Sequence, residues 1–407
     1  MRMAGRRRPD IQEKDLQGFK HFKLLLPALA RLHDNGCGRD KAGNRKLHFD
    51  QYCALFLLYM FNPIVSSLRA IQQASELAKV QRLLGCPRAS LGSLSESARV
   101  FDPECLLEVI EELAAELPSI RSDSRLKDFQ QILTLVDGTL LKALPRITEA
   151  MWISDRHRAF RLHTQFEFDR YVPMRMHLTD GANTGESDEK TVLRKNLLPD
   201  RCYVMDRWYA QFSLFNDIVS AQSSYVCRVR DNSVFDVACD RALSAAAQEA
   251  GVVQDAVVQM GLSSKPGARP DHPIRLVFVR VTPHEKRNHR KGHTGAGPSD
   301  GLLRIATNLM DVPAEIIALI YRYRWSIEVF FRFFKHVLGC RHLLSHHPEG
   351  IRIQTYCAII ACLLISLWTG RRPTLRTYEM ICFYFSGLAT EEELLAHLAR
   401  LKNHETN

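Results

Sequence analysis

The fifteen residues from Tyr321 to Lys335 limit what this chain can fold into more than any other stretch does. They include neither glycine nor proline, so one continuous helix is allowed throughout. At about 100° per residue, roughly a third of the helix circumference carries Tyr321, Arg324, Trp325, Glu328, Arg332 and Lys335. The opposite side is apolar, which predicts burial against a core. One carboxylate therefore lies among three cations and two aromatic rings.

This helix face has two interpretations. The ordinary one is a solvated amphipathic helix whose charges pair at i,i+4 spacing. The other is a catalytic carboxylate, Glu328, within a strip of side chains that bind phosphate. A Tyr and a Trp on a solvated face favour the second interpretation, and the other carboxylates of the chain decide between the two.

Two aspartates come directly after short apolar runs. Ile132–Val136 leads into Asp137, and Cys202–Met205 leads into Asp206. Each run has the length and composition of a buried strand, and the first is predicted to end in a turn at Gly138. Taken alone, Asp137 is typical of a turn residue and Asp206 of a helix N-cap.

Other periodic segments place these two runs in an α/β fold. Residues 160–168 and 172–178 alternate between apolar and polar side chains around a turn, which predicts a hairpin. Helices are predicted over 188–198 and 208–219, and a strand over 225–230. The order strand, hairpin, helix, strand, helix, strand indicates a mixed sheet flanked by helices.

The three carboxylates form a pattern that has a chemical reason. Asp137, Asp206 and Glu328 are separated by 69 and 122 residues, so only the fold brings them together. In open α/β sheets the functional side chains gather at the ends of the strands. Three carboxylates there can hold two Mg²⁺ ions, which stabilise the attacking and leaving oxygens of a phosphoryl transfer. The basic strip then holds a DNA backbone beside the ions.

Composition limits the partners and the compartment. The 407 residues carry a net charge of +10, which permits nucleic acid as a partner. The longest apolar run, 356–368, is too short to span a bilayer, and the basic N-terminus has no apolar segment behind it, so neither a membrane partner nor secretion is expected. Eleven cysteines without a CxxC pair predict free thiols in a reducing cytoplasm.

Shifts in pattern divide the chain into five segments. Residues 1–125 are expected to form a helical N-terminal domain, and 126–230 the first part of the α/β core. Residues 231–303 are expected to form an inserted β-rich domain. Residues 304–345 complete the core with the helix that carries Glu328, and 346–407 form a C-terminal helical region.

The spacing within the helix resembles a family signature. DDE transposases of the insertion-sequence 4 family share the order Tyr, two residues, Arg, three residues, Glu, six residues, Lys. Tyr321, Arg324, Glu328 and Lys335 match all four positions and all three gaps. The resemblance extends over roughly residues 46–401.

The two aspartates match the other motifs of that family. Asp137, followed by Gly-Thr, resembles the first catalytic aspartate motif, and Asp206-Arg207 resembles the second. Trp208 departs from the family pattern, which has a small residue at that position.

The resemblance implies a fold, an activity and partners. The expected fold is an RNase H-like catalytic core with an inserted β-rich domain and a helical N-terminal domain. The expected activity is cut-and-paste DNA transposition through a hairpin intermediate, with two Mg²⁺ ions, for which Mn²⁺ substitutes. The expected partners are terminal inverted repeats, target DNA and a second copy of the chain, at the nucleoid in a bacterial cytoplasm.

The site residues follow from the motifs and the helix face. Asp137, Asp206 and Glu328 are the expected catalytic residues and metal ligands. The resemblance implies that Tyr321, Arg324 and Lys335 contact DNA near the cleaved end. Further predicted DNA contacts, each with an ordinary structural alternative, are Trp325, Arg332, Arg228 and Arg230. Trp325 either stacks on an unpaired base or packs in a core.

Two other functions are consistent with the same residues. A metal-dependent nuclease without a joining step has the same carboxylates. A DNA-binding relative that has lost catalysis has the same basic surface, although the intact Asp137, Asp206 and Glu328 favour an enzyme.

Overall fold

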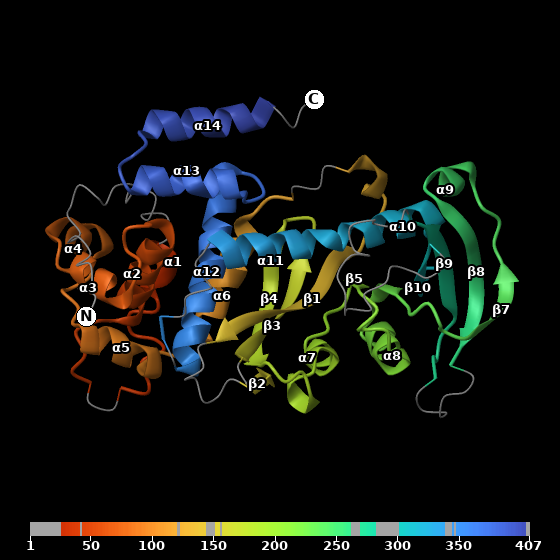
Figure 1. Cartoon of the computed structure of the whole chain (residues 1–407), viewed down its shortest axis with the longest axis horizontal. Helices are drawn as coiled ribbons and strands as arrows, with labels where there is room; N and C mark the ends of the chain where they lie inside the picture. Colours follow the sequence, from red (N-terminus) through yellow and green to blue (C-terminus); the bar gives the residue numbers. More distant parts are fainter. Residues whose placement is uncertain are drawn as a thin grey trace, which may run out of the picture. The chain divides into compact units, whose positions relative to one another are not determined.

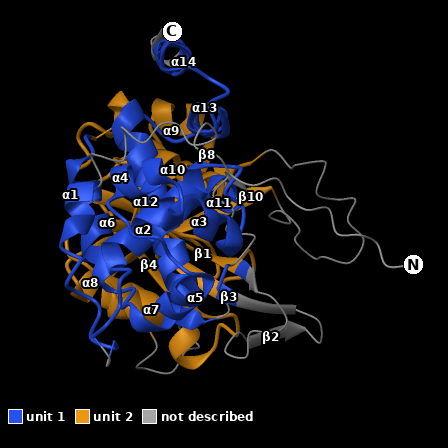
Figure 2. Ribbon diagram, turned by 90° about the vertical axis from the view of Figure 1, so that its left-hand side faces the viewer, with its two compact units in different colours: residues 1–118, 141–160, 331–407 blue, residues 119–140, 161–330 orange. Residues whose placement is uncertain are grey.

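A computed structural model of the chain describes residues 26–40, 43–119, 123–143, 151–154, 157–261, 269–281, 301–337, 344–345 and 347–403. The chain forms two compact units (Figure 2). Unit 1 comprises residues 1–118, 141–160 and 331–407, and unit 2 comprises residues 119–140 and 161–330. All three carboxylates of the predicted triad lie in unit 2.

Most strands of a ten-stranded mixed sheet lie in unit 2, and its edge strand at residues 151–154 belongs to unit 1 (Figure 1). Its order is β2(Met151–Ser154), β3(His157–Glu167), β1(Ile132–Ala143), β5(Arg201–Met205), β6(Ser224–Arg228), β10(Leu302–Thr307), β9(Ile274–Arg280), β8(Val252–Met260) and β7(Phe235–Asp240), and β4(Val172–Asp180) pairs with β3. β1, β5 and β6 are parallel, whereas β10, β9, β8 and β7 pair antiparallel. The predicted mixed α/β fold is confirmed, and the strands of segment 231–303 extend the same sheet.

Helices cover both faces of this sheet. On one face, α7(Glu189–Lys195) and α8(Phe212–Ser220) pack on alternate strand residues, including Tyr203 and Met205 of β5. On the other face, α10(Ala314–Tyr323) contacts β5, β6, β8, β9 and β10. Because successive side chains of a strand point to opposite faces, Val204 points toward the α10 face. Short helices complete the unit: η3(Ser124–Leu126), η4(Gly185–Ser187) and α9(Ala245–Glu249).

Unit 1 is helical and is built around α12(Pro348–Thr369). α2(Phe49–Phe61), α5(Leu91–Val100) and α6(Cys105–Glu116) pack on α12. The remaining helices are α1(Leu26–Ala30), α3(Leu68–Ser75), α4(Ala78–Leu84), α13(Leu375–Phe385) and α14(Glu391–Asn403). α12 is long and apolar enough to cross a membrane, but 89% of its apolar window is buried in the protein, as in a core helix.

Two local predictions around the carboxylates are wrong. β1 does not end in a turn at Asp137 but continues to Ala143. Its pairing with β5 ends earlier, and beyond that point β3 remains its neighbour in the sheet. The single helix predicted over Tyr321–Lys335 is two, α10 and α11(Trp325–Val337), because at Arg324 the backbone N–H bonds to Tyr321 O, three residues back.

Candidate active site

Strand register brings the two aspartates together. β1 and β5 are parallel, with Leu135 opposite Val204. Asp137 on β1 and Asp206, directly after β5, each follow this last registered pair by two residues, so the fold brings them to neighbouring positions at this end of the two strands. Both have the parity of Val204, which places their side chains on the α10 face of the sheet. The fold thus gathers two carboxylates that are far apart in the sequence.

Arg324 and Glu328 complete the group from the junction of α10 and α11. Arg324 Nη2 donates to Glu328 Oε1 at 2.6 Å, across one helical turn. Arg324 Nη1 lies 3.7 Å from Asp137 Oδ2. One guanidinium therefore contacts both a carboxylate of α11 and a carboxylate of β1.

The site holds an excess of negative charge. Burial, aided by the charge of Asp206, raises the pKa of Asp137 to about 7, although the Arg324 guanidinium acts in the opposite direction. Asp206 Oδ1 accepts the backbone N–H of Trp208 at 2.8 Å, which fixes the turn after β5. A carboxyl group that titrates near neutral pH inside a carboxylate cluster is characteristic of catalytic sites.

The donor set fits a hard divalent cation. Asp137, Asp206 and Glu328 present carboxylate oxygens, which are the protein ligands that Mg²⁺ prefers. A divalent ion there would counter the burial and the charge of Asp206, which raise the pKa of Asp137. Among the described residues, these three do not bring one oxygen each within 4.8 Å of one another. The Arg324 guanidinium supplies the positive charge between Asp137 and Glu328.

The segment that carries this group matches a known family. Residues 128–364 match the family described as "Transposase DDE domain". The chain belongs to this family. The matched segment includes Asp137, Asp206 and Glu328.

Relatives among curated proteins are transposases of insertion sequences. The chain is 24% identical over 242 residues to the putative transposase y4zB of Sinorhizobium fredii, covering 59% of this chain and 62% of that protein. It is 26% identical over 321 residues to a probable transposase for insertion sequence element IS5377 of Geobacillus stearothermophilus, covering 76% and 77%. The match thus spans less than two thirds of the first relative.

The chain also has a weak structural similarity to a solved transposase structure. The piggyBac transposase synaptic complex with hairpin DNA aligns with 96% of this chain and 84% of its own, at 12% identity and a TM-score of 0.43. This likeness is too weak to support a conclusion about fold or mechanism.

Aromatic and basic side chains of the chain line a hollow beside Arg324. This hollow of about 950 Å³ lies within unit 2, between α10 and the strands β9 and β10. Its polar and aromatic lining includes Arg125, Arg280, Tyr321, Arg322, Arg324 and Trp325. Trp325 is 45% exposed, so its interpretation as a core residue is wrong. Burial raises the pKa of Tyr321 to about 12, which leaves its phenol neutral and able to donate.

A second hollow of about 640 Å³ opens beside Asp206. It is lined by Asp206, Arg207, Trp208, Arg230, Asp231 and Asn232. Trp208 is 47% exposed, and Lys190 Nζ lies 4.6 Å from its ring centroid. Arg230 is therefore placed near the carboxylates, whereas Arg228 is engaged by Asp231, with Nη2 at 3.4 Å from Oδ1.

Two other predicted DNA contacts lie further along α11. Arg332 is exposed and Lys335 is partly exposed, and both belong to unit 1.

The structure also reveals a functional candidate that the sequence does not indicate. Glu189, the first residue of α7, is 6% exposed and lies against Gly138, next to the first aspartate. Its carboxylate accepts hydrogen bonds from Arg161 and from the hydroxyl of Tyr209. The local sequence signal for Glu189 is Gly138, and it is a weak one. A glycine after a strand is also typical of an ordinary turn.

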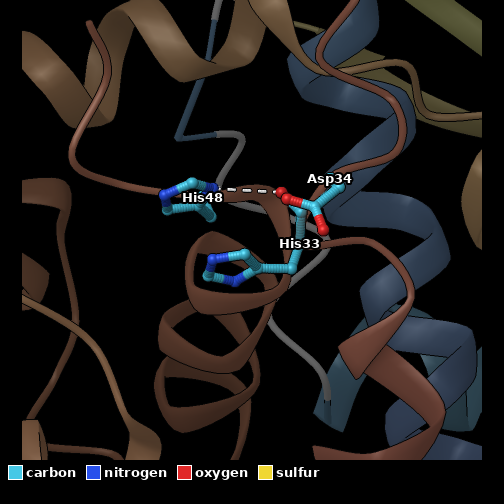
Figure 3. Close-up of side chains that lie close together, drawn as sticks. All are labelled: His33, Asp34 and His48. Carbon is cyan, nitrogen blue, oxygen red and sulfur yellow. Dashed lines mark hydrogen bonds between the residues drawn. The ribbon is translucent and has the colours of Figure 1, made fainter.

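A cluster in unit 1 has metal-binding residue types but the wrong geometry. His33, Asp34 and His48 each bring a ligand atom within 4.8 Å of the others (Figure 3). The two imidazole rings stack at 3.7 Å with planes 10° apart. Their nitrogen lone pairs therefore lie in two nearly parallel planes and do not converge on one ion. His33 Nδ1 is engaged by Asp50 at 3.0 Å, and His48 Nδ1 by His33 O at 3.0 Å.

Proposed function

We propose that this chain is a DNA transposase of the insertion-sequence 4 type, with the Tyr-Arg-Glu-Lys signature. It binds the ends of its element, cuts them and joins them to target DNA. The observation that carries the proposal is that Arg324 contacts both Asp137 and Glu328 in unit 2, with Asp206 close enough to Asp137 to help raise its pKa, within the segment that matches the transposase DDE family. On this proposal unit 2 contains an RNase H-like core, and the whole chain divides into the five segments predicted above.

Asp137, Asp206 and Glu328 are the proposed ligands of two Mg²⁺ ions, with Mn²⁺ as a substitute. The bound ions supply stabilisation of the attacking and leaving oxygens during phosphoryl transfer. Arg324 contacts Glu328 at 2.6 Å and Asp137 at 3.7 Å. Its planar fork of donors would also suit a phosphate of the cleaved strand.

The surrounding side chains are proposed to grip DNA near the cut. The neutral phenol of Tyr321 donates to a phosphate oxygen, and Arg324, Arg332 and Lys335 neutralise backbone charge. Trp325 stacks on a base where the duplex is distorted, as its 45% exposure allows. Arg230 approaches DNA through the hollow beside Asp206, and Arg228 does so from the end of β6.

The partners of the proposed enzyme are its terminal inverted repeats, target DNA and a second copy of the chain. A hairpin on the excised end is the proposed intermediate, by analogy with the insertion-sequence 4 family. The proposed compartment is a bacterial cytoplasm, at the nucleoid.

A strand-transfer assay tests this function against a nuclease without joining. The substrate is a duplex that ends in the inverted repeat of the element with a free 3′-hydroxyl, and the acceptor is a supercoiled plasmid. With Mg²⁺, the proposal predicts a covalent product of end and plasmid. Cleavage without any joined product supports the nuclease, and neither product supports a DNA-binding relative without catalysis.

A further inference from the structure

Glu189 has an unusual position for a charged side chain. It begins α7 directly after the N-cap Asp188, and it is 6% exposed. Arg161 Nη1 of β3 donates to Glu189 Oε1, and the hydroxyl of Tyr209, itself buried, donates to the same carboxylate. A buried carboxylate needs such partners, because an unpaired buried charge is strongly destabilising. Glu189 is thus fixed in place by two neighbours.

The Glu189 carboxylate occupies the space where residue 138 lacks a side chain. A Cβ atom on Gly138 would lie 2.6 Å from Glu189 Oε1 and 2.9 Å from its Cδ. Real Cβ atoms do not approach so closely, and Arg161 and Tyr209 prevent the carboxylate from moving aside. Glycine is required here by close approach rather than by a positive φ angle.

Because side chains alternate along a strand, Glu189 contacts β1 on the face of the sheet opposite to Asp137. Asp137 points toward the α10 face, so the missing side chain of Gly138 faces α7 on the opposite side of the sheet. Glu189 therefore presses on the strand beside Asp137 from the side away from Arg324. Its charge also contributes to raising the pKa of Asp137, which confirms that the two groups are close.

The same carboxylate reaches the second aspartate through Tyr209. The Tyr209 backbone N–H bonds to Asp206 O at 3.2 Å, within the turn that follows β5. Tyr209 is 1% exposed, and its hydroxyl bonds to Glu189. One buried side chain thus ties the strand that carries Asp137 to the turn that carries Asp206.

We propose that Glu189 is a positioning residue that fixes the separation of Asp137 and Asp206 for metal binding, with Arg161 and Tyr209 as its supports. This inference rests on the proposed function, since it assumes that the two aspartates are metal ligands. Partners that orient metal ligands typically change metal affinity or activity about 10- to 100-fold when they are replaced.

A purely structural role is the alternative, in which the Arg161–Glu189 pair only fastens α7 to β3. A second buried pair in the same unit provides the matched control. Arg275 Nε and Nη2 each lie 2.8 Å from the Asp255 carboxylate, and both residues are buried. This pair joins β8 and β9, and neither residue lines a hollow beside the carboxylates.

The experiment compares Glu189→Gln with Asp255→Asn in the full chain. Calorimetric titration of the DNA-free protein measures Mg²⁺ affinity, thermal unfolding measures stability, and single-turnover assays measure cleavage of end DNA. Glu189→Gln is expected to weaken Mg²⁺ binding about tenfold or more and to slow cleavage to a similar extent. Asp255→Asn is expected to lower the unfolding temperature and to leave the Mg²⁺ affinity unchanged.

Folded Glu189→Gln protein that binds Mg²⁺ and cleaves as the wild type does overturns the inference. If Glu189→Gln does not fold, Tyr209→Phe decides, because it removes a single hydrogen bond and keeps the charge. About a tenfold loss of Mg²⁺ affinity supports the inference, and an unchanged affinity overturns it. Wild-type protein that neither binds Mg²⁺ nor cleaves contradicts the proposed function itself, which distinguishes the two failures.

Discussion

At the scale of single residues, the site depends on the protonation of Asp137. Burial and the neighbouring Asp206 raise its pKa to about 7, whereas Arg324 opposes the shift. A raised pKa means that the folded, metal-free protein holds a proton that the unfolded chain releases from about pH 4 upward. The contribution of Asp137 to stability is therefore greatest at low pH and declines as the pH rises toward about 7.

The affinity for Mg²⁺ should also depend on the protonation of Asp137, but it should increase as the pH rises. Because Mg²⁺ binds only the ionised carboxyl group, its half-saturating concentration should rise about tenfold for each pH unit below about 7 and level off above it. Titration of the DNA-free protein with Mg²⁺ between pH 5.5 and 8.5, a range of about three units around that pKa, measures this. A half-saturating concentration that stays constant across the range contradicts the assignment of Asp137 as a ligand.

Lys335 carries the fourth position of the signature and belongs to unit 1. If it contacts a phosphate, Lys335→Ala should weaken end binding at every sequence and reduce the salt slope of log K by about 1. Fluorescence anisotropy at several salt concentrations measures the slope, and circular dichroism confirms the fold. An unchanged slope with unchanged affinity would remove Lys335 from the DNA interface.

The sequence identifies the site residues unequally, for physical reasons. Asp137, Asp206 and Glu328 carry local signals, because each sits at the end of an apolar run or within a spaced motif. Glu189 carries none, since its contacts with Gly138 and Tyr209 arise only when α7 packs on the sheet. The bridging role of Arg324 is also invisible, because an i,i+4 pair looks the same on any solvated helix.

At the scale of elements, the buried Arg275 fixes the segment that leads into α10. Its Nη1 donates to Leu309 O at 2.9 Å and to Val312 O at 2.5 Å, while Nε and Nη2 engage Asp255. The side chain therefore joins β9, β8 and the connection that leads into α10.

Arg275→Met tests that structural role. It leaves the Asp255 carboxylate buried without its principal partner, so the free energy of unfolding should fall by about 3–5 kcal/mol. Urea unfolding of the variant measures the loss. The double variant Arg275→Met/Asp255→Leu should recover part of it, because both buried charges are then removed. A loss below about 1 kcal/mol in the single variant would show that the pair is not required.

The elements themselves are predicted unequally too. The strand runs before Asp137 and Asp206 and the hairpin of β3 and β4 follow from periodicity. β7 does not, because most of Phe235–Asp240 is exposed and lacks the alternation of a half-buried strand. The break at Arg324 is likewise hidden, since no glycine or proline marks it and the dihedral angles there remain helical, at φ −50° and ψ −34°.

At the scale of the whole molecule, the basic composition agrees with the proposed action on DNA. A net charge of +10 accumulates polyanions without selecting among sequences. The carboxylates have the opposite effect on DNA: they repel its phosphates until cations neutralise their charge. The protein should therefore bind DNA without Mg²⁺ and cut it only with Mg²⁺, so binding and catalysis separate experimentally.

The most direct test of the central claim compares wild-type protein with Asp206→Asn and Glu328→Gln in Mg²⁺-dependent cleavage of end DNA. Both substitutions keep the size of the side chain and remove a charged ligand. The wild type should cleave at the end of the element, and each variant should lose at least about 10³-fold in rate, the scale lost with key catalytic groups, while still binding DNA. Variants that cleave as fast as the wild type would contradict the assignment of the three carboxylates as the active site.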